Sequence, residues 1–156
     1  MGKIATVVGI AIKRESRASM EVFQSRYISL QNGLEDDHKG RRTLINTGRR
    51  QITVISLEQW DEVCAELGID LPWHTRRANI CVSGRVFGPS DVFDKNRILI
   101  FSNDPILEIT GETKPCSRMD EIHPGLRDAL SKNWRGGVTC RVVNGGPIQV
   151  GDIVNC

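Results

Sequence analysis

One cysteine of this chain stands in a setting that favours chemistry. Cys116 lies in Lys114-Pro115-Cys116-Ser117-Arg118, directly after an alternating, strand-like run at residues 105–110. Pro115 cannot donate a ladder hydrogen bond, so we expect it to end the strand and to leave the next side chain on a loop. Lys114 and Arg118 flank the thiol with positive charge, which favours the thiolate, the form that acts as nucleophile and metal ligand. The alternative is a half-buried structural cysteine at a strand end.

The basic residues are mostly arginine, which indicates a local anion site. The chain has 15 arginines and 6 lysines, yet Lys+Arg total 21 against 19 Asp+Glu, so the net charge is only +2. That excess is too small to demand a nucleic-acid partner, whereas guanidinium groups suit phosphate, carboxylate and other oxyanions. Arginine doublets at 41–42, 49–50 and 76–77, with Arg135, stand where strands are expected to begin, and a barrel mouth would gather their side chains. Solvated surface positions are the alternative for each doublet.

Other catalytic and metal-binding patterns are absent from the sequence or weak. The five cysteines include no C-x-x-C pair, which argues against a zinc ribbon or a thioredoxin-type site. Asp37 and His38 are adjacent, so in a strand they would point to opposite faces, and a solvated loop is their alternative. No G-x-S-x-G motif and no phosphate-loop spacing occur, which argues against serine hydrolysis and nucleotide binding.

Strand-like segments outnumber helical ones and predict a mostly β fold. One strong helix is expected over 57–67, with Ser56 as N-cap, Gln59 three residues later and Gly68 as its stop. A second helix is expected from Pro124 to about residue 132, and residues 19–26 fit either a strand or a short helical turn. Strands are expected at 4–12, 51–55, 78–82, 97–101, 106–110, 138–142 and 148–154. The pattern favours a β-barrel with a few peripheral α-helices over a βαβ repeat.

Length and composition are those of one globular domain. The 156 residues are 39% hydrophobic and 26% charged, and no stretch approaches the ~18 apolar residues of a membrane-spanning helix. The first residues lack the apolar core of a signal peptide. We therefore expect a single domain over 1–156 in the cytoplasm, with reduced cysteines and without a membrane or nucleic-acid partner.

The chain resembles a MOSC domain, the module found at the C-terminus of molybdenum cofactor sulfurases and as free-standing bacterial proteins. The resemblance covers about residues 5–155, essentially the whole chain. Six motifs in the family's order carry it: GLEDDHKG at 33–40, RQITV at 50–54, RRANI at 76–80, KPC at 114–116, WRGG at 134–137 and GGPIQVGD at 145–152.

The resemblance implies a β-barrel core with peripheral helices and a required cysteine, matched here by Cys116, that carries sulfur or ligates molybdenum. It also implies a pocket around that cysteine; the matching residues are Asp37, His38, Arg77, Asn79 and Arg135, to which the cations beside the thiol, Lys114 and Arg118, are added. We expect Arg77, Arg135 and His38 to converge with Cys116 on one pocket, and Asn79, two residues after Arg77 and therefore on the same strand face, to join them.

The chain departs from the family pattern at one position. The family usually has glycine before the aspartate of the acidic-histidine motif, and Asp36 stands there in this chain. An extra carboxylate would weaken an anion pocket unless Asp36 points outward or pairs with an arginine.

The resemblance leaves three functions open. The first is a sulfur carrier linked to the molybdenum cofactor (molybdopterin), in which Cys116 accepts a sulfane sulfur as a persulfide and passes it to a metal-sulfur centre. The second is a molybdenum-cofactor-dependent reductase of N-hydroxylated compounds, in which Cys116 ligates the metal and arginines hold the pyranopterin phosphate. The third is a passive cofactor-binding module without turnover.

These functions imply different partners. The chain lacks the aminotransferase-like domain of the large sulfurases with its pyridoxal phosphate lysine, so a carrier would receive sulfur from a separate cysteine desulfurase. A reductase would need an external redox partner, because no ferredoxin-type cysteine cluster or flavin motif occurs.

Overall fold

The computed structural model describes residues 3–84 and 97–156, and most of them belong to strands. The strands are β1 (Ile4–Ile12), β2 (Glu21–Phe23), β3 (Ser25–Ser29), β4 (Gly33–Leu34), β5 (Ile52–Ser56), β6 (Ile80–Ser83), β7 (Ile98–Phe101), β8 (Ile106–Glu112), β9 (Val138–Asn144), β10 (Gly146–Gln149) and β11 (Ile153–Asn155). The helices are α1 (Leu57–Leu67), η1 (Trp73–Arg76, a 3₁₀ helix), α3 (Arg118–Ile122) and α4 (Leu126–Ser131).

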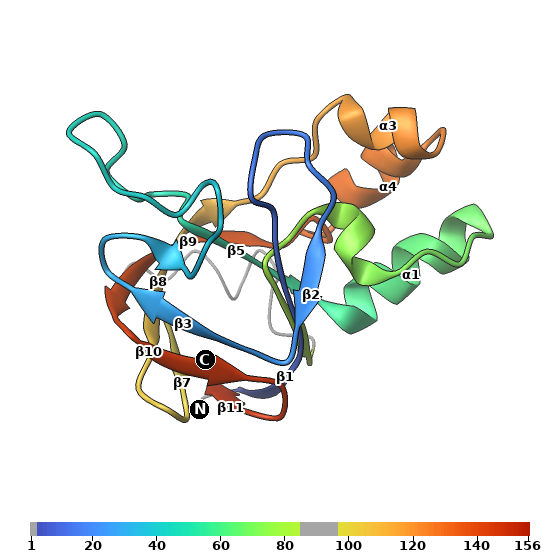
Figure 1. The fold of residues 1–156 in the computed structure, drawn as a ribbon. Coiled ribbons are helices and arrows are strands. Elements are labelled where there is room, and N and C mark those ends of the chain that lie inside the picture. The colour runs from blue at the N-terminus through green and yellow to red at the C-terminus, as the bar shows by residue number, and fades with distance from the viewer. Residues whose placement is uncertain (1–2, 85–96) are drawn as a thin grey trace.

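Seven of the described strands close into a barrel, as predicted. Their order around the ring is β11-β7-β8-β9-β5-β6-β1, and β11 closes it by pairing with both β7 and β1. Strand β2 extends β1 outside the ring, and β10, β3 and β4 form a smaller antiparallel sheet. In Figure 1 the helices lie together on one side of this barrel.

The strongest predicted helix is confirmed and has a topological role. Among the described strand pairs β5–β6 is the parallel one, and α1 is the crossover that parallel neighbours require. The Ser56 side chain accepts a hydrogen bond from the Gln59 backbone N–H at 3.4 Å, and Gly68 ends the helix with a φ of 65°. Trp60 and Val63 of α1 are buried against the outside of the barrel and against α4.

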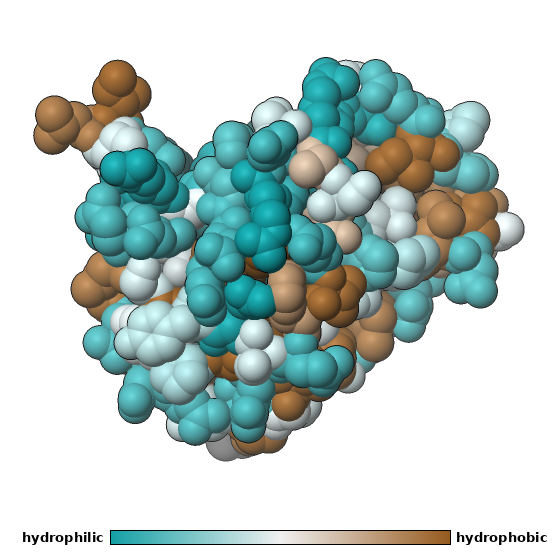
Figure 2. Space-filling model, in the orientation of Figure 1, coloured by the Kyte–Doolittle hydropathy of each residue, from teal (hydrophilic) through white to brown (hydrophobic). Residues whose placement is uncertain are grey.

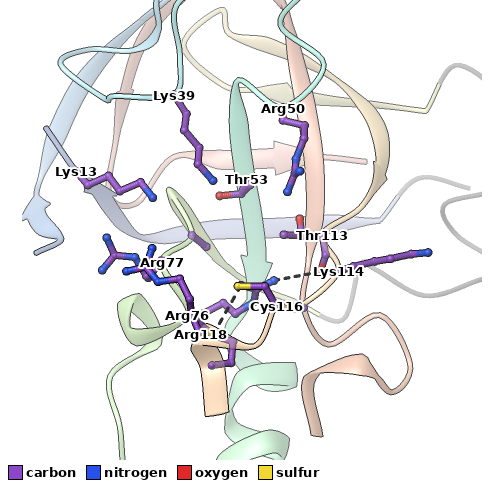
Figure 3. Close-up of a pocket in the computed structure, with 13 residues that line it drawn as sticks. Lys13, Lys39, Arg50, Thr53, Arg76, Arg77, Thr113, Lys114, Cys116 and Arg118 are labelled. Atoms are coloured by element: carbon purple, nitrogen blue, oxygen red, sulfur yellow. Dashed lines mark hydrogen bonds between the residues drawn. The ribbon is translucent and has the colours of Figure 1, made fainter. Parts of the chain in front are cut away.

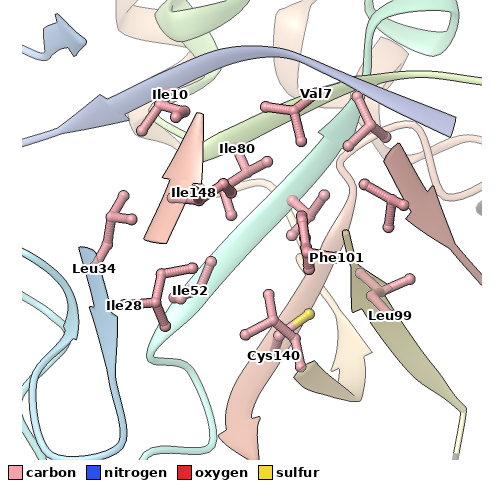
Figure 4. Packing of buried hydrophobic residues seen from close by; sticks show 14 of the residues in the cluster. Val7, Ile10, Ile28, Leu34, Ile52, Ile80, Leu99, Phe101, Cys140 and Ile148 are labelled. Carbon is pink, nitrogen blue, oxygen red and sulfur yellow. The ribbon is translucent and has the colours of Figure 1, made fainter. Parts of the chain in front are cut away.

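The barrel interior is filled by aliphatic side chains that alternate along the strands. Figure 4 shows Val7, Ile52, Ile80 and Phe101 meeting in this core, and the exposure of each is 0–1%. The alternation along β1 shifts at a bulge opposite β6 between Val7 and Gly9, so that Val7 and Ile10 are both buried in the interior.

The structure resolves the uncertain segments and corrects several boundaries. Residues 19–26 contribute to β2 and β3, so the strand alternative holds. The expected strand over 148–154 is divided into β10 and β11 by a turn at 150–151, and the helix expected from Pro124 begins at Leu126. Helix α3 was not predicted; it begins two residues after Cys116.

Within the two described ranges no helix has the length and apolar character that crossing a membrane would need.

Candidate functional site: a basic pocket beside Cys116

A pocket of about 130 Å³ opens beside Cys116, between the end of the barrel and the start of α3. Among its described lining residues seven are cations and none is a carboxylate or a histidine. The cations are Lys13, Lys39, Arg50, Arg76, Arg77, Lys114 and Arg118. Because no carboxylate among these lining residues neutralises the cations, the pocket attracts an anion.

Cys116 is held on a short segment between β8 and α3. Strand β8 ends at Glu112, before Pro115, and the Thr113 N–H donates to the Gly137 carbonyl at 2.9 Å. The Cys116 carbonyl accepts the Met119 N–H at 3.1 Å at the start of α3. The Cys116 side chain is exposed on the pocket wall, whereas Lys114 extends away from its centre (Figure 3).

Arg76 is the most buried cation of the pocket. Its exposed fraction is 7%, and its Nη2 donates to the Thr113 carbonyl at 3.1 Å. Its Nε is buried without a hydrogen-bond partner. Burial lowers the pKa of Arg76 to about 10, and the nearby Cys116 sulfur acts in the opposite direction. A desolvated guanidinium that is only partly paired gains most from an anionic ligand.

Arg77 reaches the same pocket because of its backbone conformation. Two consecutive strand residues would point to opposite faces, but Arg76 ends the 3₁₀ helix and Arg77 caps it with a φ of 68°. The Arg77 Nη2 donates to the Ala18 carbonyl, while its Nε is buried without a partner. Burial, and then the charge of Arg118, lower the pKa of Arg77.

Two lysines complete the basic wall. Lys13 directly follows β1 and is 8% exposed; burial, and then Lys39 and Arg77, lower its pKa to about 8, against the attraction of Asp37. Loss of solvent, and then Arg50, lower the pKa of Lys39. Four of the cations, Lys13, Lys39, Arg50 and Arg76, were not among the predicted site residues. The sequence signals that could have pointed to them are an expected strand that ends just before Lys13, the GLEDDHKG motif that contains Lys39, and the doublets that contain Arg50 and Arg76.

Asp37 and Asn79 support the pocket from behind its wall. Asp37 is buried and its Oδ1 accepts the Lys13 backbone N–H at 3.0 Å; burial raises the pKa of this carboxyl, against backbone hydrogen bonds from Lys13 and Lys39. The Asn79 Oδ1 accepts from the Thr53 N–H at 2.9 Å, and its Nδ2 donates to the Ala11 carbonyl at 3.2 Å. Both side chains therefore hold the strand ends that present lining residues.

The structure does not bring His38 or the Arg135 side chain into this pocket. His38 is exposed and lines two neighbouring surface grooves. The Arg135 guanidinium turns toward α1, where its Nη1 lies 3.0 Å from Glu66 Oε1 and its Nε 3.6 Å from Glu62 Oε2. The expected convergence therefore holds for Arg77 and Cys116, with Lys114 and Arg118, but not for these two side chains, and Asn79 is not among the described lining residues.

The WRGG motif contributes a glycine to the pocket instead. Gly136 lines it, and a Cβ at this position would lie 2.4 Å from the Thr113 carbonyl oxygen and 3.3 Å from Arg76 Nη2. Because no side chain fits there, the backbone of Gly136 forms the floor next to Arg76.

Asp36 lies outside the pocket and pairs with arginine. Its Oδ2 accepts from Arg26 Nη1 at 3.2 Å and lies 3.7 Å from Arg14 Nη1. The φ of Asp36 is 65°, in the left-handed region that favours glycine and that aspartate tolerates. Glycine adopts this conformation more easily still, so the position accepts either residue, and the ion pairs keep the extra carboxylate away from the basic lining.

The fold and the pocket describe a class of protein: a closed β-barrel that presents an exposed cysteine among cations at one end. The family model "MOSC domain" matches residues 35–155, so the chain belongs to the MOSC domain family. The predicted family and fold are both confirmed.

Individual relatives agree with this assignment. YuaD of Bacillus subtilis (strain 168), named as a candidate metal-sulfur cluster biosynthesis protein, is 31% identical over 116 residues, which are 67% of this chain and 58% of YuaD. The match thus spans less than two thirds of that relative's length.

Solved structures show the same fold. The crystal structure of Bacillus subtilis YuaD has a TM-score of 0.77 at 19% identity, covering 99% of this chain and 96% of that chain. YiiM from Geobacillus stearothermophilus has a TM-score of 0.67 at 16% identity (99% and 75% covered), and YiiM from Escherichia coli 0.66 at 11% (96% and 68%).

The donor set of the pocket suits an oxyanion better than a bare metal ion. In the described part of the chain no group of three His, Cys, Asp or Glu side chains could hold a metal. A metal beside Cys116 would therefore have to arrive with other ligands of its own. The Nε atoms of Arg76 and Arg77 have no hydrogen-bond partner, and a phosphate group on the molecule that carries the metal would fit these two guanidinium groups.

Proposed function

We propose that this MOSC domain is a molybdenum-cofactor-linked sulfur carrier in which Cys116 accepts the sulfur. The observation that carries the proposal is an exposed thiol on the wall of a pocket with seven cations and, among its described lining residues, no carboxylate. A thiolate and a persulfide are both anions that such a pocket stabilises. The name of YuaD, which refers to metal-sulfur clusters, agrees with sulfur chemistry.

Loading of Cys116 is a thiol–persulfide exchange. The Cys116 thiolate attacks the outer sulfur of a donor persulfide, a new S–S bond forms, the donor S–S bond breaks, and the donor leaves as a thiolate. No net oxidation occurs in this step. Release of the sulfur as sulfide takes two electrons, which a second thiol supplies as it forms a disulfide with Cys116.

The basic residues have separate parts in this proposal. Arg76 and Arg77 are fixed by the protein and hold the anionic end of the acceptor, the phosphate of the cofactor. Lys13 is buried at the same wall, and its pKa of about 8 allows it to hold or release a proton near neutral pH.

A resident-cofactor function is the second candidate, favoured by the unpartnered guanidinium nitrogens. In that case Cys116 would ligate molybdenum, and Arg76, Arg77 and Arg118 would hold the pyranopterin phosphate. The cofactor would supply two-electron reduction of N-hydroxylated compounds with an external electron donor. The same binding without turnover would be a passive cofactor-binding module.

Mass spectrometry and metal analysis test these functions together. After incubation with a cysteine desulfurase and L-cysteine, we expect the peptide containing Cys116 to gain one sulfur atom, and Cys116→Ser to gain none. Cys156→Ser is the matched control and should load like the unchanged protein. Sulfur on Cys156 in place of Cys116 would refute the carrier, and stoichiometric molybdenum in the purified protein would favour the resident cofactor.

A further inference from the structure

A projecting loop, residues 41–49, presents two large aliphatic side chains to solvent. The exposed fractions of Leu44 and Ile45 are 104% and 96%, the highest among the exposed large hydrophobic residues of the described chain. Figure 1 shows this loop standing away from the barrel at the upper left, and Figure 2 shows apolar groups at its tip. Single exposed aliphatic residues are common, but an adjacent pair at the end of a projection has nothing to pack against.

The tip is a braced turn. The Thr43 N–H donates to the Asn46 carbonyl at 2.8 Å, and the Asn46 N–H donates to Thr43 Oγ1 at 2.8 Å. The Asn46 Nδ2 also donates to the Arg41 carbonyl at 2.9 Å. These bonds fix the turn, so Leu44 and Ile45 are held outward by its conformation.

The base of the loop is fastened to the barrel. The Arg42 N–H donates to the Gln31 carbonyl at 2.7 Å, and the Arg42 guanidinium donates to Gln51 Oε1 from both Nε and Nη2. Hydrogen bonds hold both the base and the tip of the loop. Binding of a partner to the tip therefore costs little conformational entropy of the loop.

The apolar tip is continuous with the Cys116 pocket. Lys39 and Arg50 stand on either side of the loop and line that pocket. The same two residues line a neighbouring surface groove together with Ile45. A macromolecule that covers Cys116 from the side of this groove therefore contacts the tip as well.

The loop and its immediate sequence flanks are basic. Residues 38–50 contain five Lys or Arg and no Asp or Glu. Lys39, Arg41, Arg49 and Arg50 are exposed, whereas Arg42 is used to fasten the loop. The complementary surface is acidic around an apolar recess.

We infer that the projecting loop is the docking element for a protein with an acidic surface around an apolar recess, the protein that exchanges sulfur with Cys116. The inference rests on the proposed function. A folded protein is the occupant because a macromolecular donor has to bring its sulfur to Cys116, and the tip lies on that path. A small sulfur donor has no need of the tip.

The test compares two sulfur donors with one pair of variants. In Leu44→Ser/Ile45→Ser both aliphatic groups are removed; the control, Ile4→Ser/Ile153→Ser, removes two exposed aliphatic groups on β1 and β11, away from the pocket. Loading of Cys116 is measured by mass spectrometry with inorganic polysulfide and with a cysteine desulfurase carrying its persulfide, from the same organism.

The outcomes separate the docking inference from the proposed function. We expect the loop variant to load normally from polysulfide but at least about tenfold more slowly from the desulfurase at sub-saturating concentration, with the control variant unchanged. Equal loading of all three proteins by the desulfurase overturns the docking inference and leaves the carrier intact. No sulfur on Cys116 from either donor overturns the carrier itself.

Two other occupants of the tip are also tested. Co-sedimentation with phosphatidylglycerol vesicles that disappears in the loop variant would assign the tip to a lipid surface and overturn the inference. A dimer in analytical ultracentrifugation that is lost in the same variant would assign the tip to a second copy of this chain, with the same consequence.

Discussion

Replacing Lys13 by methionine should stabilise the protein while it weakens the anion site. Lys13 is a buried residue, and burial followed by two nearby cations lowers its pKa from 10.5 to about 8. Each pH unit of that lowering corresponds to about 1.4 kcal/mol, so the buried charge costs at most about 3.5 kcal/mol. This cost is a net value, because the lowered pKa already includes the attraction of Asp37.

We expect Lys13→Met to raise the free energy of unfolding at pH 7 by about 1–3 kcal/mol, which is about 2–10 °C in Tm for a domain of this size. Between pH 8 and 10.5 the unfolded chain retains a proton that the folded protein has released, so the stability of the unchanged protein rises across this window. Below pH 8 both states are protonated and the full cost remains. The gain from methionine should therefore be largest at pH 7 and shrink toward pH 10.

Urea unfolding followed by tryptophan fluorescence at pH 7 and pH 10 measures this difference. Arg14→Met, at the neighbouring exposed position, is the control and should change stability by less than about 1 kcal/mol. Added phosphate should raise the Tm of the unchanged protein more than that of Lys13→Met. A loss of stability at pH 7, or a gain of equal size at both pH values, would show that the buried ammonium does not destabilise the fold.

Three further predictions concern the pocket. Iodoacetamide at pH 7.5 should label exposed Cys116 well before Cys81, because burial raises the pKa of Cys81 to about 12; peptide mapping with Cys81 labelled first would contradict the assignment. Arg77→Ala should weaken binding of a phosphate-bearing ligand by about tenfold, measured by calorimetry, whereas exposed Arg41→Ala should change it little; equal effects would argue for a diffuse basic surface. Gly136→Ala should lose stability by about 1–3 kcal/mol in urea unfolding and also lose phosphate binding, because its Cβ would lie 2.4 Å from a backbone carbonyl oxygen; unchanged binding would exclude a rigid pocket floor.

The elements with strong local signals were predictable. Strand β1 is a continuous β-rich run, and α1 has its N-cap, its apolar face and its glycine stop within thirteen residues, so both were found at nearly the observed positions. Helix α3 has five residues, and its Met119 is buried in the hydrophobic cluster to which α1 and α4 also contribute, a placement that no local pattern reveals.

The site was only partly predictable, for a related reason. Cys116 has an informative neighbourhood in the sequence, and Arg77 belongs to a recognisable motif. Lys13 follows a predicted strand and Lys39 lies in a recognisable motif, but no local pattern shows that they meet. The end of β1 lies beside the segment after β4 because the His38 N–H donates to the Lys13 carbonyl and Asp37 Oδ1 accepts the Lys13 N–H. The WRGG motif correctly indicated the pocket, but through a different residue from the one predicted. Gly136 lines the pocket, while the guanidinium of the adjacent Arg135 binds Glu66.

The mounting of Cys116 limits how far its sulfur can travel. The segment that carries it is fastened on one side by Thr113, bonded to Gly137 and Arg76, and on the other by the first turn of α3. A thiol on a long flexible segment could reach several sites in turn. The backbone that carries Cys116 is held in place, so its sulfur can move only as far as one side chain allows. In the proposed sulfur carrier, donor and acceptor would therefore have to come to Cys116 one after the other and occupy the same opening.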